Sequence, residues 1–162
     1  MRPGIPEFIK GVAVPAADIV TPNRFELEFL TGVQVRDLNS ALGAAGEARK
    51  LGPETVLTTS LRRNDAAAGT IEMLTVSGEG AWLVGTPLLE IEVNGAGDAT
   101  AALFLAYLLR GGGPAEALSL TASAVHAVLE ETYGVGSREM ALVPAQESIV
   151  DPPRLFEARR IR

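Results

Sequence analysis

The stretch VNGAGDATAALFLAYLL, residues 93–109, places two glycines and one carboxylate directly before a long run of Ala and Leu. The run predicts a helix at 97–110. Gly95 and Gly97 can take backbone angles that are closed to other residues, and the small Ala96 lets a ligand approach the amides. The first amide groups of a helix have no partner inside it, and its N-terminus carries about half a positive charge, which favours a phosphate group. Gly95, Ala96 and Gly97 are therefore a candidate anion hole.

Asp98, the next residue, has two interpretations. A carboxylate beside a bound phosphate can remove a proton from an attacking hydroxyl group. Alternatively, Asp98 only caps the helix or interacts with its dipole. Two better-known glycine motifs do not fit, because no Lys-Ser or Lys-Thr pair follows to make a P-loop and Thr100 replaces the third glycine of a dinucleotide fingerprint.

The composition of the 162 residues, with 47% hydrophobic and 21% charged residues, is typical of one globular domain. The formal net charge of −6 disfavours nucleic-acid binding, which relies on a basic face. The chain has no Cys, which excludes disulfides and thiolate metal sites, and its single His excludes a cluster of histidine ligands. No apolar stretch reaches the roughly 18–20 residues that cross a bilayer, and the N-terminal segment lacks the apolar core of a secretory signal. We expect one cytoplasmic domain, residues 1–162, that binds neither nucleic acid nor a membrane.

Predicted helices and strands alternate along the chain. Helices are predicted at 5–10, at 23–32 with an end at Gly32, at 38–51 behind an N-cap at Asp37 or Asn39, and from Pro114 to about residue 131. Strands are predicted within 16–22, at 55–60, and as a hairpin of 70–76 and 81–87 with its turn at 77–80. The arginine-rich segment 154–162 is interpreted as a solvated tail helix. This alternation predicts an α/β fold with a mostly parallel central sheet flanked by helices.

The segment TPNRFELEFL, residues 21–30, places Asn23 and Glu26 three positions apart at a helix start. Taken alone, this spacing is typical of a capping box, in which each side chain bonds the backbone N–H of the other residue. The functional interpretation puts the pair at the carboxyl end of a strand, with Glu26 acting through water on a magnesium–phosphate complex, because Mg²⁺ keeps most of its waters. Both interpretations stay open at this stage.

Together, the Asn-x-x-Glu segment and the later Gly-x-Gly-Asp segment resemble the ribokinase-like kinases, whose members carry both elements. Within that group the chain is similar to the pyridoxal kinases over nearly all of its length. The similarity is carried by PGIPEFIKGVAVPAADIVTPNRFELEFLTG at 3–32, AVHAVLEET at 124–132 and VPAQESIVDPP at 143–153. The resemblance implies a three-layer ribokinase-like fold and ATP-dependent phosphorylation of pyridoxal to pyridoxal 5'-phosphate. The GAGD motif alone fits sugar kinases equally well.

The resemblance also implies a role for each matching residue. Asp98 matches the base that deprotonates the hydroxymethyl group of the substrate, and the anion hole matches the site of the transferring phosphoryl group. Asn23 and Glu26 match the metal–phosphate element, with Glu26 acting through water. The positions that match the ATP site are Thr21, Asn23, Glu26, Thr59, Thr86, Pro87, Leu88 and Leu89. Alternatively, the hydroxyl groups at 58–60 only solvate the end of their own strand. His126 is interpreted as a packed side chain of an apolar helix.

The resemblance further implies ATP as co-substrate, Mg²⁺ as the metal, and pyridoxal or a related B6 vitamer as substrate. We also expect a homodimer. The resemblance also implies that the N-terminal half of the family, with most of the pyridoxal-contacting residues, is not part of these 162 residues. Two alternatives therefore stay open: a ribokinase-like kinase for a sugar or a hydroxymethylpyrimidine, and a nucleotide-binding module without catalytic activity. Without the strands of that half, we expect the strand near Ile19 to have an unpaired edge that tends to associate.

Overall fold

The central strands are apolar on both faces of the sheet. The computed structural model describes residues 4–162, and in it these strands are β2 (Thr55–Leu61), β3 (Thr70–Ser77) and β4 (Gly80–Pro87). Val56, Leu74 and Leu83 belong to one apolar cluster, whereas Leu57 and Val84 belong to a second one. Because successive side chains of a strand point to opposite faces, each cluster lies on its own side of the sheet, and both sides need a cover.

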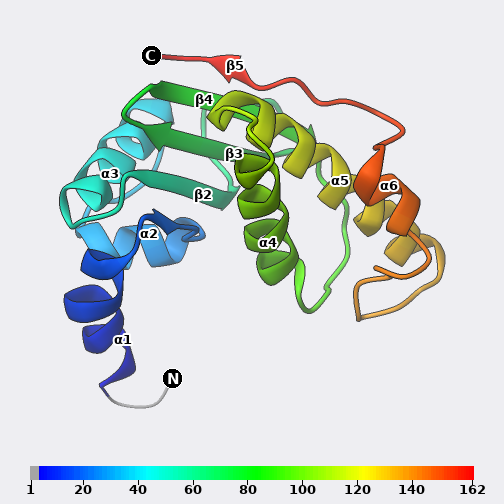
Figure 1. Ribbon diagram of the computed structural model, residues 1–162, viewed down its shortest axis with the longest axis horizontal. Coiled ribbons are helices and arrows are strands. Elements are labelled where there is room, and N and C mark those ends of the chain that lie inside the picture. The colour runs from blue at the N-terminus through cyan, green and yellow to red at the C-terminus, as the bar shows by residue number, and fades with distance from the viewer. Residues whose placement is uncertain (1–3) are drawn as a thin grey trace.

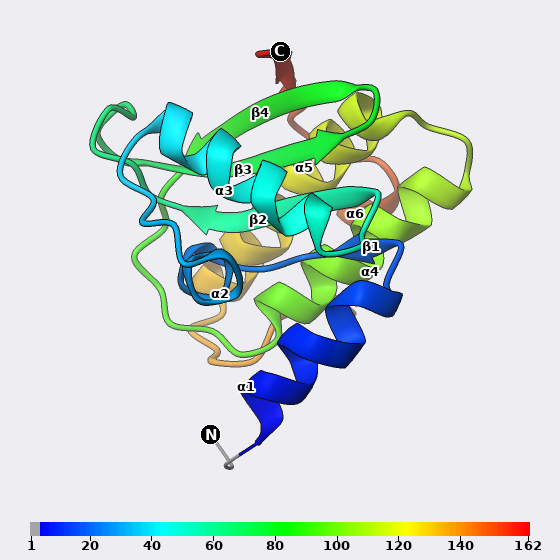
Figure 2. The same ribbon diagram turned by 90° about the vertical axis from the view of Figure 1, so that its left-hand side faces the viewer.

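Helices cover both faces, which gives three layers (Figures 1 and 2). The helices are α2 (Arg24–Thr31) and α3 (Leu38–Lys50) on one face, α4 (Ala96–Leu109) and α5 (Pro114–Gly134) on the other, and the short α6 (Gln146–Val150) beside α5. Leu27 of α2 and Ala44 of α3 pack in the first cluster, and Phe104 of α4 and Leu118 of α5 pack in the second. The three-layer α/β fold expected from the resemblance is confirmed.

The sheet has five strands in the order β1-β2-β3-β4-β5. Strand β1 (Ile19–Val20) runs parallel to β2, but the pairs β2–β3, β3–β4 and β4–β5 are antiparallel. The expectation of a mostly parallel sheet is therefore wrong for residues 4–162. The reason lies in the connections: Gly78 and Glu79 alone join β3 to β4, and the loop 62–69 between β2 and β3 contains no helix. A parallel return needs a long crossover, so these short links bring the chain back antiparallel.

The helix ends follow local signals that the sequence contains. Asp37 caps α3 and accepts a hydrogen bond from the Ser40 amide at 2.8 Å, which decides between the two expected N-caps. Gly32 ends α2 in the left-handed conformation with φ 74°. Helix α5 extends to Gly134, three residues beyond the expected end at Glu131. No helix in the described part of the chain is long and apolar enough to cross a membrane.

The C-terminal segment is extended, so the expected tail helix at 154–162 is wrong. Strand β5 (Arg159–Arg160) pairs with Trp82 and Leu83 of β4. Before it, the amides of Phe156 and Ala158 donate hydrogen bonds to the hydroxyl oxygens of Ser123 and Ser119 on α5, at 2.8 and 2.9 Å. These external acceptors and the edge of β4 satisfy the tail backbone without a helix. The tail therefore lies across α5 and along the edge of the sheet (Figure 1).

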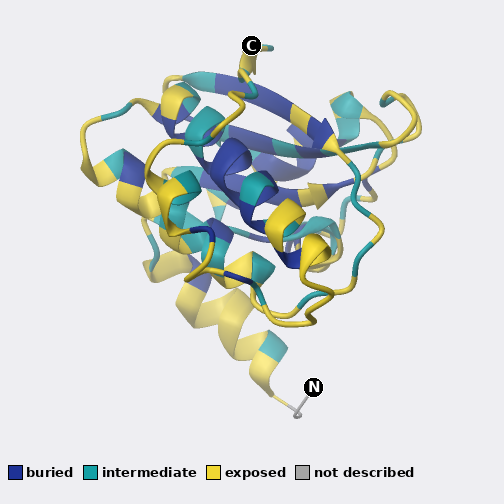
Figure 3. Ribbon diagram, turned by 90° about the vertical axis from the view of Figure 1, so that its right-hand side faces the viewer, coloured by how far each residue is buried: buried dark blue, intermediate teal, exposed yellow. Residues whose placement is uncertain are grey.

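The N-terminal helical segment projects from the body and buries little. It consists of α1 (Ile5–Phe8), the π-helical η1 (Ile9–Ala13) and the 3₁₀ turn η2 (Val14–Ala16), and no residue of α1 or η1 is buried. The side chains of Ile5, Phe8, Ile9 and Val12 are 41%, 59%, 41% and 54% exposed, at spacings that place them on one helical stripe. Figure 3 shows this segment exposed along most of its length. Next to it, β1 pairs only with β2 among the described residues, as expected for an unpaired edge.

Candidate active site

A cavity of about 460 Å³ opens where the N-terminus of α4 meets the ends of the central strands. Its walls come from the end of β2, from β3 and β4, from the loop 88–95, from the first turns of α4 and from one face of α5. The expected site residues that line it are Thr59, Thr86, Pro87, Leu88, Leu89, Ala96 and Gly97. Residues distant in sequence therefore share one cavity.

The candidate anion hole forms the start of α4. Gly95 is the N-cap, with φ 87°, and its carbonyl accepts a hydrogen bond from the Ala99 amide at 2.9 Å. A Cβ at Gly95 would meet no atom within 4 Å, so the left-handed backbone, and not lack of space, requires glycine there. Ala96 and Gly97 lie in the first helical turn, whose N–H groups have no helical partners. Ala96 and Gly97 line the cavity, so this part of its wall, at the positive end of the α4 dipole, suits an anion.

Hydrogen bonds to a distant segment hold the turn before α4 in place. The Asn94 amide donates to the carbonyl of Arg138 at 2.9 Å, and Asn94 Nδ2 donates to Glu139 Oε1 at 3.1 Å. A parallel backbone bridge also joins Asn94 to Glu139. These contacts fix the turn on one side of the cavity, and Arg138 itself lines that cavity.

Asp98 lies in the first turn of α4, next to the cavity but not among its lining residues. Its side chain is exposed and takes part in no hydrogen bond or ion pair within residues 4–162, and α4 has no side-chain cap. The capping interpretation of Asp98 is thus not what the structure shows. The carboxylate is free to accept a proton from a ligand.

Asn23 and Glu26 form the capping box that their spacing indicated. The Glu26 amide donates to Asn23 Oδ1 and the Asn23 amide donates to Glu26 Oε2, both at 2.9 Å. A parallel bridge joins Asn23 to Thr59, and the Thr59 amide donates to the carbonyl of Pro22 at 2.9 Å. The box therefore stands at the carboxyl ends of β1 and β2, beside the cavity wall formed by Thr59. Thr21 is half-buried and lines no cavity in the described part of the chain.

Ser60 connects the box to the main cavity. It lines both the 460 Å³ cavity and a shallower cavity of about 310 Å³ that Asn23, Arg24, Phe25 and Glu28 complete. Ser60 has φ 51°, the one positive φ of a non-glycine residue within residues 4–162, and the β2–β3 register shifts between Thr58 and Leu61. A bulge of this kind bends a strand end and re-aims its side chains. Left-handed backbone at a serine costs free energy and is concentrated at functional sites.

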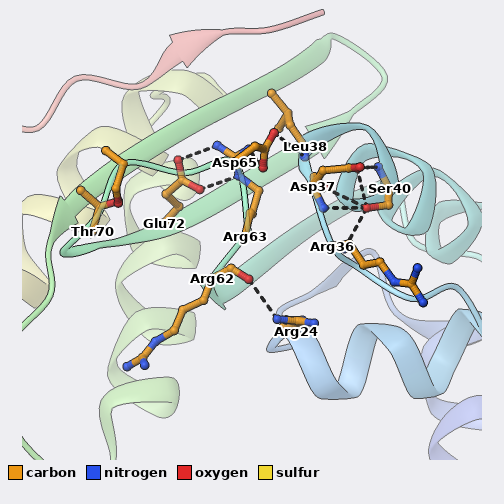
Figure 4. Close-up of polar contacts among 11 residues, drawn as sticks. Arg24, Arg36, Asp37, Leu38, Ser40, Arg62, Arg63, Asp65, Thr70 and Glu72 are labelled. Atoms are coloured by element: carbon orange, nitrogen blue, oxygen red, sulfur yellow. Dashed lines mark hydrogen bonds and ion pairs between the residues drawn. The ribbon is translucent and has the colours of Figure 1, made fainter.

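A buried ion pair that the sequence analysis did not identify supports the same wall. Arg63 donates from Nε and Nη2 to the two carboxylate oxygens of Glu72, at 2.6 and 2.8 Å, and the side chains are 4% and 9% exposed. Figure 4 shows Arg63 between Glu72 on β3 and Asp65 in the loop after β2. The hydrogen bonds to Glu72 raise the pKa of the Arg63 guanidinium, while burial opposes this shift. Glu72 also lines the cavity, so the pair fixes a charged residue of its wall.

Asp65 extends this contact to the helix layer. It pairs with Arg63 and accepts a hydrogen bond from the amide of Leu38, at the start of α3, at 3.3 Å. The loop after β2 is therefore attached both to β3 and to α3. No signal in the sequence identifies these partners, because each one lies in a different predicted element.

The charged side chains of the described part of the chain give no metal cluster by themselves. Within residues 4–162, no three or more His, Asp or Glu side chains are placed to hold one ion. Glu26 is exposed, and its Oε1 takes part in no hydrogen bond in that part of the chain. A single carboxylate that acts through water, as the resemblance implies for Glu26, fits this arrangement better than an all-protein metal cage.

The phosphomethylpyrimidine kinase family model matches residues 1–143. The chain belongs to this kinase family. Its relatives include pyridoxal kinase PdxY of Rubrobacter xylanophilus, which is 65% identical over 162 residues, and the matched part is 99% of this chain and 56% of the relative. The kinase fold also matches pyridoxal kinase from Trypanosoma brucei, with TM-score 0.85 and 27% identity over 96% of this chain and 56% of that one.

A further structure with this kinase fold is pyridoxal kinase from Leishmania donovani in complex with ADP and ginkgotoxin. It has TM-score 0.89 at 23% identity, covering 99% of this chain and 56% of that chain, and it shows the fold alone. The chain thus spans a little over half the length of the relatives that it matches.

Proposed function

We propose that this chain carries the ATP-binding and phosphoryl-transfer part of a pyridoxal kinase. The observation that carries the proposal is the start of α4: an N-terminal turn of glycine and alanine opens into the cavity, and Asp98, exposed and unpaired within residues 4–162, lies next to it. The 65% identity to pyridoxal kinase PdxY of Rubrobacter xylanophilus supports pyridoxal as the substrate. The ADP in the related Leishmania donovani structure supports a nucleotide as the co-substrate.

The proposed reaction is an in-line phosphoryl transfer. Asp98 takes the proton of the substrate hydroxymethyl group while the oxygen of that group forms a bond to the γ-phosphorus. The bond between the γ-phosphorus and the bridging oxygen of the β-phosphate breaks, which releases ADP. The amides at Gly95, Ala96 and Gly97 stabilise the negative charge of the transferring group. The geometry thus supplies mainly positioning and charge stabilisation, which suffice for this class of reaction.

The nucleotide is proposed to extend from the anion hole along the cavity. Thr59, Thr86, Pro87, Leu88 and Leu89 line that path. Asn23 and Glu26 are bridged to this path through Thr59, and we propose that Glu26 Oε1 binds water of the magnesium–phosphate complex. Mg²⁺, when bound, neutralises charge on the phosphates. For Thr21 the support is the resemblance alone, for the dimer it is the expected strand edge near Ile19, and for a cytoplasmic location it is the composition.

A second substrate class has its own support. The matching family model is named for phosphomethylpyrimidine kinase, and the anion hole with Asp98 suits any substrate that presents a hydroxymethyl group. A hydroxymethylpyrimidine or a sugar is therefore the alternative to pyridoxal. The resemblance implies that the residues that choose among these substrates lie in the part of the relatives that the chain does not span.

A pyridoxal phosphorylation assay tests the proposal. This chain is compared with an extended protein, in which it is joined to the part of the Rubrobacter xylanophilus relative that it does not span. We expect the extended protein to form pyridoxal 5'-phosphate with ATP and the chain alone to form none. Product from a hydroxymethylpyrimidine or a sugar, but not from pyridoxal, would overturn the substrate. No ATP-dependent phosphorylation of any of these substrates by the extended protein would overturn the kinase function.

A further inference from the structure

His126 is the polar member of the α5 wall of the cavity. Four residues of α5 line it, Ala122, Val125, His126 and Leu129, and their spacing places them on one helical face. The other three side chains are apolar. The His126 side chain is 4% exposed, so its ring nitrogens must find partners within the protein or in a ligand.

The surroundings of the ring decide which nitrogen holds the proton. Nδ1 lies 3.5 Å from Oε2 of Glu130, one turn further along α5, and the ring centroid lies 4.9 Å from that of Phe156 in the C-terminal segment. A carboxylate next to Nδ1 favours the tautomer that carries its proton on Nδ1. In this tautomer Nε2 has a lone pair and acts as a hydrogen-bond acceptor.

Nε2 has no partner in the described residues. Three buried side-chain atoms within residues 4–162 lack a hydrogen bond: Thr58 Oγ1, Thr75 Oγ1 and His126 Nε2. The two threonines do not line the cavity, whereas His126 does. An unsatisfied buried acceptor is rare in native proteins and calls for an explanation, and here the neighbouring cavity offers one.

The cavity has both polar and apolar lining. Ala96 and Gly97 suit a phosphate, whereas Val84 of β4 and the α5 residues Val125 and Leu129 are apolar parts of its wall that suit a flat aromatic base. His126 lies among the residues of this apolar wall. A base placed there would bring its ring substituents close to the imidazole.

We propose that His126 Nε2 accepts a hydrogen bond from the exocyclic amino group of the bound base and so makes the site selective for a 6-aminopurine. The inference rests on the proposed nucleotide site and adds the residue that reads the base. A purine with a carbonyl oxygen at position 6 presents a second acceptor to Nε2 and leaves both groups unpaired. Selectivity then comes mainly from rejection of the oxo base.

Binding of ATP and inosine triphosphate to the chain tests this inference. The two nucleotides differ in the amino or oxo group at position 6. We expect the wild-type chain to bind ATP about 3- to 10-fold more tightly, the effect of one neutral hydrogen bond. His126→Phe keeps an aromatic ring beside Phe156 and should bind both nucleotides alike. His126→Gln returns an acceptor and should recover a preference for ATP, whereas Leu129→Met, on the same wall, should change both affinities by the same factor.

The wild-type chain also gives a readout that needs no substitution, because it contains a single histidine. The imidazole signals in NMR spectra are therefore those of His126, and ATP should shift its Nε2 resonance toward a hydrogen-bonded value while inosine triphosphate should not. ATP binding that leaves these signals unchanged would overturn the role of His126 but keep the nucleotide site, as would an unchanged ATP preference in His126→Phe. Failure of the wild-type chain to bind ATP at all would overturn both.

Discussion

Replacing Arg63 by Met should strongly destabilise the chain, because it leaves the Glu72 carboxylate buried without its partner. Glu72 is 9% exposed and accepts two hydrogen bonds from Arg63, at 2.6 and 2.8 Å. Breaking a buried ion pair on one side costs about 3–5 kcal/mol in free energy of unfolding. For a domain of this length, about 2–4 °C of melting temperature is lost for each kcal/mol, so the midpoint should fall by roughly 6–20 °C.

Replacing both partners separates the cost of an orphaned charge from the value of the pair. In Arg63→Met combined with Glu72→Leu no buried charge is left, and apolar residues of similar volume often replace a buried pair at little cost. We therefore expect the double variant to be more stable than Arg63→Met alone. The coupling energy between the two positions should lie at about 0.5–3 kcal/mol, the range for residues in direct contact.

Urea unfolding followed by tryptophan fluorescence measures these differences. The chain has one tryptophan, Trp82, which is 8% exposed in β4, so its emission reports unfolding of the sheet. A loss below about 1 kcal/mol in Arg63→Met would refute the argument, because surface ion pairs have values of that size. A double variant that loses the sum of the two single losses would refute it as well.

Three further predictions concern other parts of the molecule. If Glu26 acts on magnesium through water, Glu26→Gln should raise the Mg²⁺ requirement of the extended protein and change its stability by less than about 1 kcal/mol. An unshifted Mg²⁺ titration would show that Glu26 only caps α2. The amide of Val35 donates a hydrogen bond to Glu28 and lowers the pKa of that carboxyl from 4.5. The Glu28 carboxylate should therefore contribute its full stabilisation above pH 4.5, and this stabilisation should be lost as the pH falls through the lowered pKa of the folded state. Glu28→Gln should remove this part of the acid dependence in unfolding measurements, and an unchanged profile would contradict it. The unpaired edge of β1 and the exposed apolar stripe that includes Phe8 should make the isolated chain self-associate. Phe8→Glu should shift sedimentation equilibrium toward the monomer, and a wild-type chain that stays monomeric at high concentration would contradict the predicted self-association.

Elements with local signals could be predicted from the sequence. The box of Asn23 and Glu26, the cap at Asp37 and the turn at Gly32 each depend on residues three or four positions apart, and all three are present. The β3–β4 hairpin likewise depends on one short turn. These signals lie within one element or one turn, so a single sequence contains them completely.

Features that depend on distant partners could not be predicted in this way. The tail is extended because its amides donate hydrogen bonds to Ser119 and Ser123 and because β5 pairs with the edge of β4. The bond between Arg63 and Glu72 joins a loop to a strand. In each case the deciding contact is tertiary and overrides local propensity.

The candidate site also contains both kinds of feature, local ones and ones that depend on tertiary contacts. Ala96 and Gly97 follow from a local turn, and the structure places them in the cavity. His126 has a helical spacing that the sequence shows, but which wall that face of α5 joins depends on the packing of α5 against β4. Its missing hydrogen bond is visible only in the folded chain.

The turnover of Asp98→Asn in the extended protein tests the central claim most directly. Asp98 makes no hydrogen bond or ion pair within residues 4–162, so the substitution should leave stability and ATP affinity unchanged. Loss of a general base should lower pyridoxal phosphorylation by roughly 10²- to 10⁴-fold. Near-wild-type turnover in this variant would contradict the account and reduce Asp98 to an exposed residue at the start of a helix.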